Sequence, residues 1–245
     1  MRPLYVLVAA LVLQSVAVFA GDWLRRRRQG VEETERKDLA TILPAALTLL
    51  TLLIGFSFSM AANRYDQRKM MEEDEANAIG TEYARAGLLP GQTAQIRALL
   101  RQYTAQRILF YEVTDPAQRA AINAETARLQ AALWDSVAPA ALASPSPVSA
   151  LAVSGMNDVL NAQGYTQAMF WNRLPSGAWI LMIGVAGFCS FLFGYSEYRG
   201  ARLRLWILPV IVALPLGLVA DMDSPRQGMI RVVPQNLLAL QAMLE

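Results

Sequence analysis

The sequence predicts an all-α integral membrane protein with four transmembrane helices and a mostly helical extramembrane domain between the second and the third. Two observations lead to this prediction. Hydrophobic residues make up 54% of the 245 residues and charged residues only 17%, whereas a soluble domain usually has about a quarter charged residues. The apolar residues are also gathered in long uncharged stretches, which is typical of membrane spans and not of a single core.

Four uncharged stretches are candidates to cross the hydrocarbon core of a bilayer, which is about 30 Å thick. They comprise residues 4–20, 39–62, 177–196 and 205–220. Because backbone groups in lipid must be hydrogen-bonded within the chain, each stretch is expected to be a helix. The first stretch also resembles a signal peptide ending at Ala20, but the cluster Arg25 to Arg28 that follows it is typical of a retained span.

The spans divide the chain into regions whose sides of the membrane follow from their basic residues. The regions are a first helix pair with a basic cytoplasmic loop (1–62), a helical extracytoplasmic domain (63–176), a second helix pair (177–220) and an extracytoplasmic tail (221–245). Basic residues in short loops mark the cytoplasmic side. Six lie in 21–38 and three in the loop after the third span, against seven near span ends on the opposite side, spread over longer segments. The amino terminus is therefore expected outside the cytoplasm as well.

Apolar residues in the extracytoplasmic domain recur every three to five residues, which predicts amphipathic helices. One such pattern precedes a break at Pro90 and another follows it. A third helix is predicted to begin at Asp115 and Pro116, an N-cap followed by proline at the first helical position. It is expected to end in 138–147, an Ala- and Pro-rich segment that fits a loop or a frayed helix end. A fourth helix is predicted near 148–164.

The composition argues against an enzyme. The chain has no histidine and one cysteine, which removes the residues that build most zinc sites and most Ser-His or Cys-His nucleophile pairs. It contains no glycine-rich phosphate loop. Residues 63–175 carry 10 basic and 11 acidic residues, a balance that does not favour nucleic acid. We therefore expect no catalytic residues, no cofactor, no metal and no nucleic-acid partner.

Small and polar residues of the second span fall on one face of a helix. They recur at intervals of three or four residues: Thr48, Thr51, Gly55, Ser59 and Asn63. Two explanations are open. The face packs closely against a neighbouring helix, as small residues at this spacing allow, or it lines a water-filled conduit.

The third span has a stripe of small residues that predicts close helix packing. The stripe consists of Gly184, Gly187, Ser190 or Phe191, and Gly194. The single cysteine, Cys189, is then expected to be a small core residue and not a reactive one.

A charge network is predicted where the second helix leaves the membrane. If this helix continues, its polar face adds Asp66, Met70, Glu73 and Asn77. Residues 221–228 emerge on the same side, and carboxylates at a membrane boundary are costly unless they are paired or hydrated. The expected pairs are Arg64 or Arg68 with Asp221 or Asp223, and Arg226 with Asp66 or Glu73.

Two segments are similar to the signature blocks of a known family. They are GFSFSMAANRYDQRKMMEEDEANAIGTEYARAGLLP (55–90) and DMDSPRQGMIRVV (221–233). Both resemble blocks of the bacterial bestrophin-like membrane family. The resemblance implies a homo-oligomeric ion channel of the bacterial inner membrane, with membrane lipid and small inorganic ions as partners and with the pore lined by the second span. It would place the narrow part of the pore at Gly55, Phe56, Ser57, Phe58 and Ser59. Phe56 and Phe58 would then form an apolar gate that closes by dewetting.

The chain departs from the bestrophin pattern in ways that affect the expected function. It lacks an acidic calcium-binding run near the carboxyl end, and its basic residues place both termini outside, whereas bestrophin termini are cytosolic. Bestrophins conduct anions, but the acidic residues 72–75 favour cations at a pore mouth. The sign of the ion is therefore left open. The alternative function is that of a non-transporting membrane sensor or scaffold whose exterior domain binds a partner.

Overall fold

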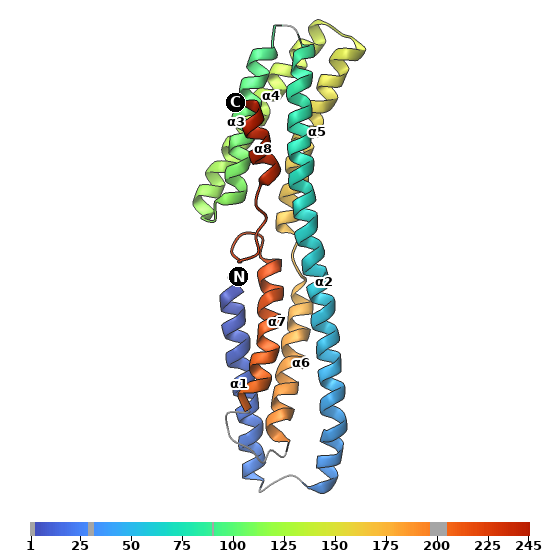
Figure 1. The fold of residues 1–245 in the computed structure, drawn as a ribbon, viewed down its shortest axis with the longest axis vertical. Coiled ribbons are helices and arrows are strands. Elements are labelled where there is room, and N and C mark those ends of the chain that lie inside the picture. Colours follow the sequence, from blue (N-terminus) through green and yellow to red (C-terminus); the bar gives the residue numbers. More distant parts are fainter. Residues whose placement is uncertain (1–2, 29–31, 90, 197–204) are drawn as a thin grey trace. The chain divides into compact units, whose positions relative to one another are not determined.

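The computed structural model describes residues 3–28, 32–89, 91–196 and 205–245, and every regular element within them is a helix. The elements are α1 (Pro3–Arg27), α2 (Glu33–Arg85), the short 3-10 helix η1 (Ala86–Leu88), α3 (Thr93–Glu112), α4 (Pro116–Ala143), α5 (Pro147–Trp171), α6 (Ser176–Tyr195), α7 (Ile207–Asp223) and α8 (Gln235–Leu244), as Figure 1 shows. No strand occurs within these ranges. The all-α prediction is confirmed.

The helices belong to two compact units. Unit 1 consists of Met1–Arg64 and Arg173–Arg231, and unit 2 consists of Tyr65–Asn172 and Val232–Glu245. Helix α2 contributes its first part to unit 1 and its last part to unit 2 without interruption. The predicted tail 221–245 is divided between the two units.

In unit 1, α1 packs against α6 and α7 (Figure 1). The closest approach of α1 and α6 depends on two glycines, since a Cβ on Gly21 would overlap the Phe191 carbonyl oxygen and a Cβ on Gly194 would overlap the Val18 carbonyl oxygen. Cys189 is fully buried in the core of this unit, as predicted.

The predicted packing stripe of the third span is only partly correct. Ser190 is buried and Gly194 is in close contact with α1. A Cβ on Gly184 or Gly187, in contrast, would have no neighbour within 4 Å. The α6 face that packs in unit 1 instead carries Met182 and Ala186, because the positions of α1 and α7 decide which side of α6 is covered.

Three helical stretches are long and apolar enough to cross a membrane, among the residues described: Pro3–Arg27, Glu33–Leu88 and Pro147–Tyr195. The predicted fourth span corresponds to α7, which has 17 residues and an internal proline, Pro215. At 1.5 Å per residue such a helix is about 26 Å long, slightly less than the hydrocarbon core.

Some residues used in the predictions lie outside the described residues. They are Arg2, Arg199, Arg202 and Arg204, which were counted for the orientation of the spans, and Pro90, the predicted helix break.

In unit 2, the last part of α2 contributes to one hydrophobic core together with α3, α4, α5 and α8. The core includes Ile79, Leu100, Tyr103, Leu133 and Met156. It also encloses an ion pair between Glu75 and Arg107, both of whose side chains are 0% exposed. Glu72 fixes the start of α8 by accepting hydrogen bonds from Asn236 Nδ2 at 2.7 Å and from the Leu237 backbone N–H at 2.9 Å.

Helix ends in unit 2 agree with the prediction for α4 and extend beyond it for α5. The Asp115 side chain accepts a hydrogen bond from the Gln118 backbone N–H at 2.9 Å, so the predicted N-cap of α4 is confirmed. Helix α4 continues past Pro139 and ends at Ala143, within the predicted segment 138–147. Burial of Val137 on the core side and the high helix propensity of the alanines favour this extension. Helix α5 also extends past the predicted residue 164, to Trp171.

Candidate functional site

One face of α2 is not covered by the described part of its own chain. In unit 1 this face consists of Thr48, Thr51, Gly55, Ser59 and Asn63, all of which are exposed. We call this set the α2 stripe. The opposite side of the helix carries Leu50 and Ala61, which are buried against the rest of the unit. Within the described residues, the structure therefore shows a small and polar surface that no other part of unit 1 covers.

The threonines of the α2 stripe are bonded to their own helix. Thr48 Oγ1 donates to the Pro44 carbonyl oxygen and Thr51 Oγ1 donates to the Leu47 carbonyl oxygen, both at 2.9 Å. Each hydroxyl proton is satisfied within the helix, so the oxygen lone pairs remain as the outward polar groups. At Gly55 an added Cβ would meet no atom within 4 Å, so glycine is not required here by packing within the chain.

Two phenylalanines flank the stripe at the level of Gly55. Phe56 is 62% exposed and Phe58 is 40% exposed. Ser57 lies between them in sequence but is only 4% exposed, because a residue one or two positions along an α-helix points to a different side. Ser57 therefore faces its own chain, unlike the other residues of the predicted pore lining.

The continuation of this face in unit 2 carries exposed polar residues, while its acidic neighbours are buried. Asp66, Met70, Glu73 and Asn77 are exposed. Glu72 and Glu75, which belong to the same acidic run, are buried with the partners described above. The continuous helix puts the first group on the polar side and the second group on the core side.

Arg68 has partners at the end of α5 that were not predicted, and its pairing with Asp221 or Asp223 stays a prediction. It is buried, and it donates hydrogen bonds from Nε to the Met169 carbonyl oxygen and from Nη2 to the Asn172 carbonyl oxygen, both at 3.2 Å. These carbonyls lie at the C-terminal end of α5, where a positive charge is favourable. Arg68 is thus an anchor for α5.

Arg64 forms one of the predicted pairs. Its Nη1 lies 3.5 Å from Asp223 Oδ1, which also accepts a hydrogen bond from the Leu174 backbone N–H at 2.8 Å. The pairing of the buried Arg226 with Asp66 or Glu73 stays a prediction.

Asp221 organises the turn that follows α7. Its carboxylate accepts hydrogen bonds from the backbone N–H groups of Met229 and Ile230, at 2.9 and 2.8 Å. A Cβ on Gly228 would lie 2.6 Å from Asp221 Oδ1, so only glycine lets the chain pass this close to the carboxylate. A side-chain partner was predicted for Asp221, but its hydrogen bonds to backbone groups of the following turn were not.

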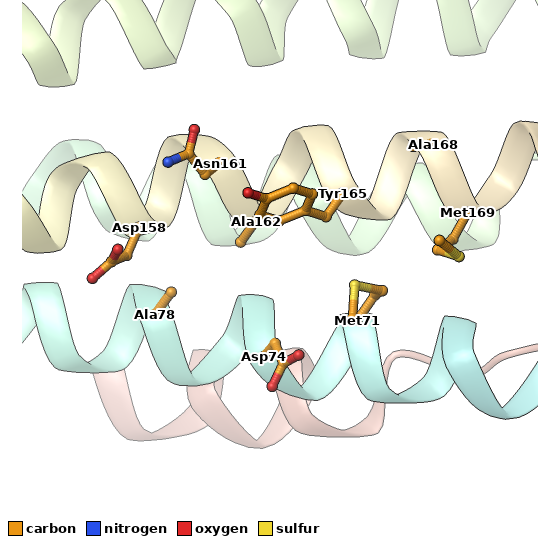
Figure 2. A pocket seen from close by; sticks show the side chains of 9 residues that line it. All are labelled: Met71, Asp74, Ala78, Asp158, Asn161, Ala162, Tyr165, Ala168 and Met169. Atoms are coloured by element: carbon orange, nitrogen blue, oxygen red, sulfur yellow. The ribbon is translucent and has the colours of Figure 1, made fainter.

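A groove of about 590 Å³ lies between α2 and α5 in unit 2. It is lined by Met71, Asp74, Ala78, Asp158, Asn161, Ala162, Tyr165, Ala168 and Met169. Figure 2 shows Met71 and Met169 facing each other across it. The groove is mainly apolar with carboxylates among its lining residues. No group of three or more His, Cys, Asp or Glu side chains in the described part of the chain is arranged to bind a metal.

The core side of α2 carries buried acids that were not predicted. Glu75, Ile79, Glu82 and Ala86 are spaced by four, three and four residues and are all buried. This spacing defines one helix face. Two glutamates within an apolar helical pattern were the available signal, because the fold must bury them together with the core residues beside them.

Comparisons with known proteins agree on one family. A bestrophin-like domain matches residues 8–237. A solved structure of a bacterial bestrophin homologue from Klebsiella pneumoniae is 12% identical, with a TM-score of 0.68 over 98% of each chain. A point mutant of that homologue is 11% identical, with a TM-score of 0.70 over 98% of this chain and 97% of the other. The sequence matches no curated protein. Because the domain match extends over most of the chain and the fold is shared over nearly all of it, the protein belongs to the bestrophin-like family of membrane proteins.

Proposed function

We propose that the protein is a homo-oligomeric ion channel whose pore is lined by the α2 stripe of several copies. The observation that carries this proposal is the exposure of the whole stripe in a helix that is otherwise apolar enough to span a membrane. A single polar-sided helix cannot enclose a pore. Several copies arranged about a common axis turn the stripe toward shared water, where its hydroxyl oxygens and Asn63 remain hydrated.

The phenylalanines beside Gly55 form the gate in this proposal. Phe56 and Phe58 are exposed, and they lie at the level of Gly55, the smallest residue of the stripe. Apolar side chains at a constriction close a pore by expelling its water. Exposed Asp66 and Glu73 follow on the polar side of α2 and form the mouth, with Arg64 and Asp223 as a further charge pair. Acidic rings favour cations, and the sign of the ion is decided by the measurement below.

The proposed setting is a bacterial inner membrane crossed by α1, α2, α6 and α7. In this topology the basic loop 21–38 faces the cytoplasm, and residues 63–176 and the tail lie outside. Helix α7 completes the second pair with a modest local thinning of the bilayer, which a short span requires.

Purified protein in planar bilayers tests this proposal. We expect unitary currents whose reversal potential in a salt gradient gives the sign of the ion. Substitutions Gly55→Leu and Ser59→Phe put bulk into the pore and should reduce the unitary conductance severalfold. Ile180→Phe, on an exposed face of α6, is the matched control and should leave the conductance unchanged. Absence of currents across salts, pH and voltage would reject conduction.

The alternative is a membrane sensor or scaffold that does not transport ions. The groove between α2 and α5 favours it, because an apolar groove with polar residues among its lining can hold a partner's helix or loop. In that case the α2 stripe serves only for packing between copies. A symmetric particle with no continuous axial cavity, together with silent bilayers, would support this alternative.

A further inference from the structure

Glu82 is a buried carboxyl group in the contact between α2 and α5. Its side chain is 0% exposed, and neither of its oxygens has a hydrogen-bond partner within the part of the chain that the structure describes. An ionised carboxylate in such a site loses its hydration and gains no protein donor in return. The site therefore favours the neutral carboxyl group, which carries its proton.

Helix α5 is closely fitted to this carboxyl group. A Cβ on Gly155 would overlap Glu82 Oε2 and would lie 2.5 Å from Arg85 Nη1. Glycine at position 155 is thus what allows the two helices to approach at this level. Because the group is enclosed, it regains water only if α5 moves away from α2.

The charged neighbours of Glu82 act in opposite directions. Arg85, on the same helix, favours the ionised form, whereas Asp158 on α5 disfavours it. Arg85 Nη1 donates to the Leu151 carbonyl oxygen at 3.4 Å. Arg97, which comes from α3, is directed at the neighbouring residue Tyr83, donating to its carbonyl oxygen at 3.1 Å. Burial is the largest effect and, with Asp158, raises the pKa of Glu82 from 4.5 to about 8.

We propose that Glu82 is a proton-binding site that controls the contact between α2 and α5. In the packed state the carboxyl group holds a proton against Gly155. When α5 separates from α2, the proton passes to water and the carboxylate becomes hydrated. The proposal concerns unit 2 alone and goes beyond ion conduction, so either can fail without the other.

Proton linkage gives this contact a definite pH dependence. Between the two pKa values of Glu82, the packed state holds a proton that the separated state has released. Each pH unit in this range therefore favours separation about tenfold, and the effect levels off above about pH 8, where both states are ionised.

Two measurements on the full-length protein in lipid nanodiscs test the proposal. Infrared difference spectra between pH 6 and pH 10 should show the loss of a protonated carboxyl band with a midpoint near 8, and Glu82→Gln should remove that band. Amide hydrogen exchange around Gly155, corrected for the intrinsic rate, should accelerate about tenfold per pH unit from pH 6 to pH 8. In Glu82→Gln this acceleration should disappear.

Neighbouring substitutions distinguish a proton site from a merely structural residue. Asp158→Asn should lower the midpoint of the infrared band, and Arg85→Gln should raise it, because each removes one of the two opposing charges. Glu112→Gln, an exposed glutamate at the end of α3, should change neither measurement. The proposal is overturned if the band survives in Glu82→Gln, if the midpoint does not respond to Asp158→Asn, or if exchange near Gly155 is independent of pH.

Discussion

Glu75 is a single residue on which the stability of the unit 2 core depends, because it pairs with Arg107 inside that core. Both side chains are fully buried, and Tyr111 and Thr166 also donate hydrogen bonds to the Glu75 carboxylate. Glu75→Gln leaves the buried guanidinium without its counter-charge, which costs about 3–5 kcal/mol. We expect a large fall in the thermal unfolding temperature.

An exposed pair provides the control for this prediction. Glu125 and Arg128 lie one turn apart on the surface of α4, where solvent weakens their attraction. Glu125→Gln should leave the unfolding temperature unchanged within error. Equal effects of the two substitutions would mean that burial does not determine the importance of the Glu75 pair.

Gly228 is the second position at which one residue decides local structure. Gly228→Ala places a methyl group against the Asp221 carboxylate, which then cannot hold the backbone of Met229 and Ile230. We expect a loss of about 1–3 kcal/mol, typical of overpacking, seen as a lower unfolding temperature. Gly177→Ala, at a site with no atom within 4 Å, should not lower it.

At the scale of elements, α1 and α6 depend on glycine where their backbones meet. Gly194→Leu forces the helices apart at Val18, whereas Gly184→Leu on the same helix points into open space. Removing the close approach of two helices in lipid removes much of their van der Waals attraction. We expect Gly194→Leu to lower both the yield of monodisperse protein and the unfolding temperature. Each decrease should be several times larger than the decrease caused by Gly184→Leu. Similar losses for both would contradict this packing.

The contact between α2 and α5 predicts how stability depends on pH. The pKa of Glu82 in the folded state is raised to about 8. Its contribution to the free energy of unfolding is therefore fully present below the pKa of the unfolded state, 4.5, and is lost as the pH rises toward 8. Relative to Glu82→Gln, the wild-type protein should lose about 1.4 kcal/mol per pH unit in this range. Equilibrium unfolding of the two proteins between pH 5 and pH 9 measures the difference, and parallel curves would contradict the prediction.

At the scale of the whole molecule, cysteine labelling tests the proposed membrane topology. The single cysteine, Cys189, is buried, so Cys189→Ser gives a background without thiols. On that background Asn161→Cys should react with a membrane-impermeant maleimide in intact spheroplasts, and Arg27→Cys should react only after permeabilisation. Both positions are exposed, so a reversed pattern would show that the basic-residue count gives the wrong orientation.

The sequence by itself determined the properties that depend on neighbouring residues along the chain. Uncharged apolar stretches and helical periodicity predicted an all-α membrane protein, and the pair Asp115 and Pro116 predicted the start of α4. Interval counting also identified the α2 stripe as one helix face. These signals are local because a helix satisfies its backbone hydrogen bonds within itself.

Only the tertiary structure decided which helix faces are covered. It placed Ser57 inward and Gly184 outward, buried Glu82 against Gly155, and closed the Asp221 carboxylate on backbone groups of the following turn. In each case the deciding neighbour is a different helix or a backbone group. A helical pattern defines a face but not its partner, because packing free energy depends on residues that lie far apart in sequence and meet only in the folded chain.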